Sequence, residues 1–148
     1  MKPQFSAEIL LVEDDAKDAE LIITALRNRH ISGEVVHLTD GDQFMDSLFY
    51  ASLYTSWHEI SIPRVILLDL NLKTVHGLDV LRVLKSDARA RTIPVVVFTA
   101  SQRDIELMES YNLGVNSYVA KPSDPQEFMD VVGDIGHYWL NVNQPLRH

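Results

Sequence analysis

Short apolar runs alternate with amphipathic segments from one end of the chain to the other. Each apolar run has the length of a strand, and each amphipathic segment repeats its apolar residues at helical spacing. The expected strands are Glu8–Val12, Glu34–Leu38, Val65–Asp69, Pro94–Thr99 and Asn116–Ala120. The expected helices are Asp15–Arg29, Gly41–Tyr50, Gly77–Ser86, Gln102–Tyr111 and a last helix that starts at Asp124. This alternation predicts an α/β fold, a doubly wound parallel sheet with helices on both faces.

Two of the expected helices begin at cap signals. Ser101 with Asp104 three residues later predicts a cap for the fourth helix, and Asp124 with Glu127 predicts a capping box for the last. Between the second helix and the third strand, Ala51–Pro63 is a longer polar and aromatic connection. Its length indicates a functional or partner-facing loop.

The third expected strand ends on a charge. Val65–Leu68 is an unbroken apolar run, which is typical of a strand buried on both faces of a sheet, and Asp69 follows it directly. A bare carboxylate in such a place is costly unless another group pairs with it. Asp69 is therefore the first candidate for a functional side chain.

The carboxyl ends of parallel strands share one rim, and ligands bind there. The polar residues at these ends are Glu13, Asp14 and Asp15 after the first strand, Asp69 and Asn71 after the third, Thr99 in the fourth, and Lys121 before Pro122 after the fifth. Clustered carboxylates repel unless a cation lies among them, and oxygen-only ligands favour a hard ion such as Mg²⁺. Beside such an ion, Asp69 could accept a phosphoryl group as an aspartyl phosphate, contacted by Thr99 and Lys121.

Composition limits the alternatives. The chain has 148 residues, 46% of them apolar and 23% charged, as expected for a single globular domain. No apolar run reaches the roughly 20 residues that span a bilayer, and no secretory signal is recognisable. A net charge of −8 without a basic cluster argues against nucleic-acid binding. The absence of cysteine excludes disulfides and thiolate sites and fits a cytoplasmic protein.

Four motifs in order resemble one family. They are LVED (Leu11–Asp14), LLDLN (Leu67–Asn71), VVFTA (Val96–Ala100) and SYVAKP (Ser117–Pro122). Together they resemble the receiver domain of bacterial two-component response regulators. The resemblance implies a flavodoxin-like sheet with strand order 2-1-3-4-5. It also implies one receiver domain over residues 1–148, with a core of about 7–140 and a C-terminal tail, 141–148.

The resemblance also implies roles for individual residues. The implied roles are Asp69 as phosphoacceptor, Glu13 and Asp14 as the acidic pair that binds Mg²⁺, Asn71 as a backbone-carbonyl ligand, Thr99 as switch hydroxyl, Tyr118 as the aromatic that follows it, and Lys121 as phosphoryl contact, with a cis peptide bond before Pro122. Two positions depart from the family pattern. Lys73 stands where proline is usual, and His76 stands where an acidic residue is common. We expect these two residues to change the phosphorylation or dephosphorylation kinetics without abolishing the chemistry.

A narrower resemblance concerns partners. The long connection before the third strand and the aromatic end of the last helix resemble the stand-alone regulators paired with bacteriophytochrome histidine kinases. That group implies a sensor histidine kinase as partner and a homodimer that uses the fourth and fifth helices, the fifth strand and the C-terminal extension. Tyr138, Trp139 and Leu140 are the candidate dimer contacts, since large aromatic residues are good interface anchors.

Simpler structural explanations exist for each residue taken alone. Glu13–Asp15 could be acids at a helix N-terminus, where they favour the helix dipole. Thr99 could be a helix cap, Lys121 a surface lysine, and Tyr118 a core residue. Tyr138 and Trp139 could pack against their own sheet.

Three functions remain open. The favoured one is a phosphorylatable switch that signals through protein contacts and catalyses only its own phosphorylation and dephosphorylation. A phosphorylation-independent adaptor is less favoured because Asp69, Thr99 and Lys121 are all present. An Mg²⁺-dependent phosphohydrolase is less favoured still, since Glu13–Asp15 lacks the Asp-x-Asp arrangement such enzymes usually carry. Neither a Gly-x-Gly-x-x-Gly motif nor a P-loop is present to indicate a nucleotide enzyme.

Overall fold

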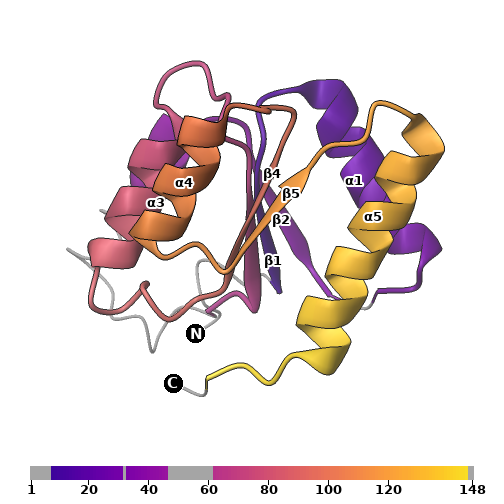
Figure 1. The fold of residues 1–148 in the computed structure, drawn as a ribbon. Helices are drawn as coiled ribbons and strands as arrows, with labels where there is room; N and C mark the ends of the chain where they lie inside the picture. Colours follow the sequence, from indigo (N-terminus) through magenta and orange to yellow (C-terminus); the bar gives the residue numbers. More distant parts are fainter. Residues whose placement is uncertain (1–7, 32, 47–61, 147–148) are drawn as a thin grey trace.

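The protein is an α/β fold built on one parallel sheet (Figure 1). The computed structural model describes residues 8–31, 33–46 and 62–146. The strands are β1 (Ile9–Val12), β2 (Val35–Leu38), β3 (Val65–Leu68), β4 (Val95–Thr99) and β5 (Ser117–Ala120). The helices are α1 (Ala16–Asn28), α3 (Gly77–Ser86), α4 (Asp104–Leu113) and α5 (Pro125–His137), with residues 41–46 also helical. The strand order β2-β1-β3-β4-β5, with every pairing parallel, confirms the predicted fold class.

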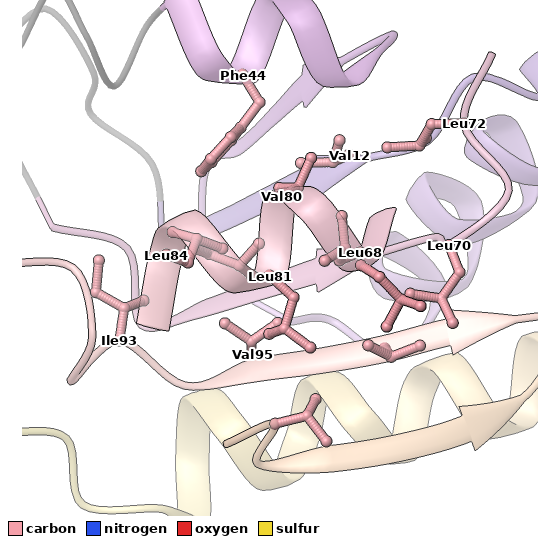
Figure 2. Packing of buried hydrophobic residues seen from close by; sticks show 14 of the residues in the cluster. Val12, Phe44, Leu68, Leu70, Leu72, Val80, Leu81, Leu84, Ile93 and Val95 are labelled. Atoms are coloured by element: carbon pink, nitrogen blue, oxygen red, sulfur yellow. The ribbon is translucent and has the colours of Figure 1, made fainter. Parts of the chain in front are cut away.

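The two faces of the sheet are covered by different helices. Figure 1 shows α1 and α5 on one side of the sheet and α3 and α4 on the other. Because side chains alternate along a strand, Ile9 and Leu11 pack with α1 and α5, whereas Val12 packs on the opposite face. Figure 2 shows the cluster on that opposite face, where Leu81 and Leu84 of α3 pack with residues of β3 and β4. The central strand β3 is therefore buried on both faces, as its apolar run predicts.

Most predicted boundaries hold to within one or two residues, and α3 holds at both ends. The end of the expected helix Gly41–Tyr50 and most of the connection Ala51–Pro63 lie outside the described residues. The predicted cap at Ser101 is wrong. The N-cap of α4 is Arg103, whose side chain makes no cap bond. Ser101 lies two residues before it, where its hydroxyl donates to Glu106 and accepts from the Arg103 N–H at 3.4 Å.

The last helix begins as predicted and packs closely on α1. An Asp124 carboxylate oxygen accepts a hydrogen bond from the Glu127 N–H at 2.9 Å. Glycine inside a helix costs about 1 kcal/mol relative to alanine. Here two glycines let the helices approach: a Cβ on Gly133 would lie 2.6 Å from an Arg29 nitrogen, and one on Gly136 would lie 2.5 Å from a Leu26 methyl.

After α5 the chain makes a π-helical turn, Tyr138–Val142. Leu140 in this turn is buried, and its carbonyl accepts a hydrogen bond from Arg64 at 2.7 Å. Trp139 packs beside the cluster that α1 and α5 form with the sheet, while Tyr138 is 47% exposed. In the described part of the chain, no helix is long and apolar enough to cross a membrane.

Gly77→Ala should destabilise the protein much more than Gly136→Ala. A Cβ on Gly77 would lie 2.3 Å from the Asp69 carbonyl oxygen and 2.5 Å from the Leu70 Cα, so the backbone would have to move. We expect a loss of about 2–3 kcal/mol of unfolding free energy. At Gly136 the obstacle is the end of the flexible Leu26 side chain, so the helix propensity of alanine offsets most of the strain. Urea denaturation of both variants tests this order, and equal losses would contradict it.

Candidate functional site

The carboxyl ends of β1 and β3 place two acids side by side. Val12 is the register partner of Leu68, so Glu13 and Asp69, the next residues on each strand, leave the sheet together. Both side chains are buried. On the far side of β4, the Lys121 N–H donates to the Thr99 carbonyl at 2.8 Å and extends the β4–β5 pairing by one residue. The sheet register thereby brings the predicted acids and Lys121 to one rim.

Lys121 joins three acids from separate elements. Its Nζ lies 2.5 Å from Glu13 Oε1, 2.7 Å from Asp18 Oδ2 and 3.0 Å from Asp69 Oδ2. The Lys121 side chain is only 6% exposed, so these contacts are shielded from water. The charge at the end of the buried strand is thus paired, and Lys121 is not a surface lysine.

The two buried acids respond differently to this environment. Burial raises the pKa of Glu13 to about 8, reinforced by the charge of Asp69 and opposed by Lys121. Burial also acts to raise the pKa of Asp69, but the charge and hydrogen bond of Lys121, with the Asn71 N–H, outweigh it and hold that pKa below its usual value. Burial acts to lower the pKa of Lys121, but the hydrogen bonds that its ammonium donates to Asp18 and Glu13, with the negative charges of Asp69 and Glu13, outweigh burial and raise that pKa. Asp69 is therefore the charged acid of the pair.

Three acids lie close enough to share an ion. Glu13, Asp14 and Asp69 each offer a carboxylate oxygen, and these oxygens all lie within 4.8 Å of one another. The Asn71 N–H donates to Asp69 Oδ1 at 3.1 Å, which places Asn71 beside the group. The Asp15 side chain is not one of the three, because it caps α1 by accepting from the Asp18 N–H at 2.9 Å, while the Asp15 N–H donates to Glu13 Oε2 at 3.2 Å. A set of oxygen donors of this kind suits a hard divalent cation.

The predicted switch residues meet at Ser101. Thr99 is fully buried, and its hydroxyl oxygen accepts a hydrogen bond from the Ser101 N–H at 3.3 Å. The Tyr118 hydroxyl donates to the Ser101 carbonyl at 3.3 Å. Tyr118 also packs beside the core cluster under α3, so it has a packing role as well as a polar contact.

At this rim the predicted cis peptide bond before Pro122 is wrong, and Asp18 is a contact of Lys121 that the sequence analysis did not identify. The peptide bond before Pro122 is trans, which is the isomer that bonds to proline favour by about 0.5–1 kcal/mol. Sequence reasoning did not select Asp18, although it stands in the first turn of the helix that follows Glu13 and Asp14. The available signal was its position: an acid in the first turn of α1 lies next to the end of the strand that leads into that helix.

The chain matches a known family over most of its length. Residues 9–133 match the response regulator receiver domain, and the chain belongs to that family. It is therefore a receiver domain, the class of protein that acts in two-component signalling.

Two sequence relatives cover most of this chain. The probable methanogenesis regulatory protein FilR2 of Methanothrix harundinacea is 40% identical over 139 residues, covering 92% of this chain and 85% of the relative. The response regulator Rcp1 of Synechocystis is 33% identical over 134 residues, covering 90% and 89%.

Solved structures agree with the fold. The Mn²⁺-bound form of Rcp1 has a TM-score of 0.81 at 32% identity and covers 94% of this chain and 98% of its own. The phosphorylated cyanobacterial phytochrome response regulator RcpA has a TM-score of 0.83 at 35% identity, covering 95% and 99%. The bacteriophytochrome response regulator RtBRR has a TM-score of 0.68 at 41% identity, covering 99% and 84%.

Mg²⁺ should stabilise the protein more at pH 8.5 than at pH 6. The pKa of Glu13 is raised above its unfolded value of 4.5 to about 8, so the folded protein binds a proton that the unfolded chain releases. That contribution to stability is present below pH 4.5 and is lost as the pH rises towards 8. A divalent ion can replace the proton once Glu13 is charged. We expect the Mg²⁺-induced rise in Tm to grow across this range, and to be nearly independent of pH in Glu13→Gln. A pH-independent effect in the unmodified protein would contradict the prediction.

Proposed function

We propose that the chain is a phosphorylation-controlled switch in which Asp69 accepts a phosphoryl group from a sensor histidine kinase. The observation that carries this proposal is the Asp69 carboxylate itself, which is charged, 6% exposed and held by Lys121 at the end of a buried strand. In the transfer, a new bond forms between an Asp69 oxygen and phosphorus. The bond from phosphorus to the donor histidine nitrogen breaks, and its electron pair stays with that nitrogen.

We propose Mg²⁺ as the divalent ion. Glu13, Asp14 and Asp69 would hold it with carboxylate oxygens, and the backbone carbonyl of Asn71 would complete the protein ligands. The all-oxygen donor set of this chain and the Mn²⁺-bound form of its relative Rcp1 support a divalent site here. When bound, such an ion neutralises charge on the transferred phosphoryl oxygens.

Lys121 and Thr99 would act on the phosphoryl group directly. The Lys121 ammonium is already 3.0 Å from Asp69 Oδ2, so it is placed to contact an oxygen of a group attached there. The Thr99 hydroxyl would turn from the Ser101 N–H towards the same group, and Tyr118 would follow. This movement would remodel the surface formed by α4 and β5, which is the output of the switch.

The upstream partner we propose is a bacteriophytochrome histidine kinase. Support comes from the phytochrome response regulators RcpA and RtBRR, which resemble this chain over nearly all of its length. We further propose that the chain acts in the cytoplasm as one receiver domain over residues 1–148, without nucleic-acid binding and without turnover of another substrate. The acidic net charge of −8 supports a protein-binding role over a nucleic-acid-binding one.

A homodimer is the assembly we propose. Tyr138 supports it with an exposed ring at the end of α5, and Ile105, Met108 and Tyr111 expose apolar surface on α4. Trp139 is half-buried and Leu140 is buried within its own chain, so these two residues would contribute mainly by holding the turn that carries Tyr138. Size-exclusion chromatography with light scattering should show a dimer that Tyr138→Ala weakens.

Intact mass tests the central proposal. Incubation with acetyl phosphate and Mg²⁺ should add one phosphoryl group, and chelation of the ion with EDTA should prevent it. A phosphorylated bacteriophytochrome kinase should transfer its label to the chain faster than an unrelated histidine kinase does. If several small donors give no adduct in the presence of Mg²⁺, the phosphorylation-independent adaptor becomes the better account.

A further inference from the structure

Asp14 differs from the other two acids that could share an ion. Glu13 and Asp69 each pair with the Lys121 ammonium at the buried rim. Asp14 is half-buried and offers an oxygen to the same group, but among the residues that the structure describes, no hydrogen bond or ion pair holds its carboxylate. The position of the Asp14 carboxylate therefore depends on the backbone that carries it.

The peptide group between Glu13 and Asp14 is held by a side chain of β2. The Glu13 carbonyl oxygen lies 2.7 Å from His37 Nε2. A carbonyl oxygen can only accept a hydrogen bond, so the imidazole donates and Nε2 carries a hydrogen. Because a peptide group is planar, a bond to the Glu13 carbonyl also fixes the direction of the Asp14 N–H and the position of the Asp14 Cα.

The His37 ring takes the place of a backbone donor. The Glu13 N–H donates to the Leu38 carbonyl at 3.1 Å, which continues the parallel pairing of β1 and β2 by one bond. The next bond of that pairing would run from the Asp40 N–H to the Glu13 carbonyl. The chain instead turns into the helix at residues 41–46, where the Asp40 side chain accepts a hydrogen bond from the first turn at 2.7 Å. His37 therefore supplies the donor that the strand no longer offers.

The fold gives this ring room beside α1. His37 is the register partner of Leu11, so its side chain lies on the face of the sheet that α1 covers. Ala16 and Ala19 of α1 line a surface hollow together with His37, and their small side chains leave space for the imidazole. The ring is half-buried there, so its bond to the Glu13 carbonyl is partly shielded from water.

We propose that His37 is a positioning residue for the divalent ion, which acts through the Glu13 carbonyl on Asp14. This inference rests on the proposed function. In the ion-free protein the His37 bond holds Asp14 near the place where the ion needs its carboxylate, so less order has to be gained when the ion binds. Once bound, the ion itself holds Asp14. The bond therefore strengthens ion binding, whereas the rate of phosphoryl transfer at saturating Mg²⁺ does not depend on it.

Two variants at position 37 separate the hydrogen bond from the bulk of the side chain. His37→Leu removes the donor and leaves an apolar group of moderate size on the edge strand. His37→Gln keeps a donor, because its amide nitrogen lies as many bonds from Cβ as the imidazole Nε2 does. Thr24→Val is the matched control, because it removes a hydroxyl from the α1 wall of the same hollow and leaves the donor to the Glu13 carbonyl in place.

We expect isothermal titration calorimetry with Mg²⁺ at pH 8.5 to give a Kd about two- to tenfold higher for His37→Leu than for the unmodified protein, the range of one net hydrogen bond. His37→Gln should bind Mg²⁺ more tightly than His37→Leu does, and Thr24→Val should bind it as tightly as the unmodified protein. In the reaction with acetyl phosphate, His37→Leu should raise the Mg²⁺ concentration that gives the half-maximal rate by the same factor and leave the saturating rate unchanged.

Nuclear magnetic resonance of the His37 ring nitrogens tests the bond without a substitution. The signals of Nδ1 and Nε2 show which nitrogen carries a hydrogen, because the two ring nitrogens are chemically distinct. We expect a hydrogen on Nε2 in the ion-free protein. A ring whose only hydrogen lies on Nδ1 cannot donate to the Glu13 carbonyl from Nε2, and that result would overturn the inference.

The outcomes distinguish this inference from the proposed function. If the unmodified protein neither binds Mg²⁺ nor forms the adduct, the proposed function falls and this inference falls with it. If the unmodified protein does both, but His37→Leu keeps its Mg²⁺ affinity or His37→Gln binds the ion as weakly as His37→Leu, the positioning role alone is wrong. A lower saturating rate at an unchanged half-maximal Mg²⁺ concentration would also overturn it, because His37 would then act on the transfer and not on the ion.

Discussion

Asp69→Asn should abolish the phosphoryl adduct with every donor while leaving the protein folded. An amide has neither the charge nor the nucleophilic oxygen that the transfer requires. The fold should tolerate the change because Lys121 keeps Glu13 and Asp18 as partners. We expect intact mass to show no added phosphoryl group, and thermal unfolding to show a Tm within a few degrees of the unmodified protein.

Asp18→Asn is the matched control for this loss. Asp18 also accepts a hydrogen bond from Lys121, but it is not among the acids whose oxygens lie within 4.8 Å of one another. The control variant should therefore still form the adduct. A persisting adduct in Asp69→Asn would place the phosphoacceptor elsewhere, and a loss in both variants would show only that the Lys121 contacts matter.

Lys121→Met should destabilise the protein strongly in the absence of divalent ions, and Mg²⁺ should restore most of the loss. Lys121 is the cation that the buried Glu13 and Asp69 and the partly exposed Asp18 share. Removing one partner of a buried ion pair costs about 3–5 kcal/mol, because the remaining charges are left uncompensated. An added divalent cation can replace that charge. Urea denaturation with Mg²⁺ and with EDTA measures both effects.

Lys85→Met provides the comparison. Lys85 is also half-buried, but its ammonium donates to the carbonyls of Arg91 and Ile93 and to the Asn116 side chain, not to acids. Its replacement should destabilise the protein without a selective rescue by Mg²⁺. If Mg²⁺ restores both variants equally, the ion is not substituting for the Lys121 charge.

Lys121→Met should also slow phosphorylation. The rate of adduct formation should fall about 100-fold or more in this variant, as expected when one donor to a transferred group is lost.

The class of fold could be predicted from the sequence because the hydrophobic pattern and the cap of the last helix were both clear. The apolar runs alternated with amphipathic segments, and the central run Val65–Leu68 had no polar interruption. Such patterns are local, and they survive tertiary packing because burial of the same faces stabilises both the element and the sheet. The α5 start at Pro125 after Asp124 was equally clear, since the cap bond spans only three residues.

Pairings between distant segments could not be read in this way. The sequence indicated that Glu13, Asp69 and Lys121 share a rim, but only the sheet register decided that one ammonium contacts both acids and Asp18. The Ser101 cap was wrong because α4 begins two residues later than that cap requires, with Arg103 at the N-cap. The contact of the Ser101 hydroxyl with the buried Glu106 could not be read from the sequence either.

The sequence by itself determined the alternating elements, the strand-end acids and the family. Tertiary structure alone decided which charges neutralise one another, that Leu140 faces inward to its own core, and that His76 reaches Glu106. The physical reason is the separation along the chain over which each effect acts. Hydrophobic periodicity and caps act over a few residues, whereas the state of a buried charge depends on every group that folding brings within a few ångströms of it.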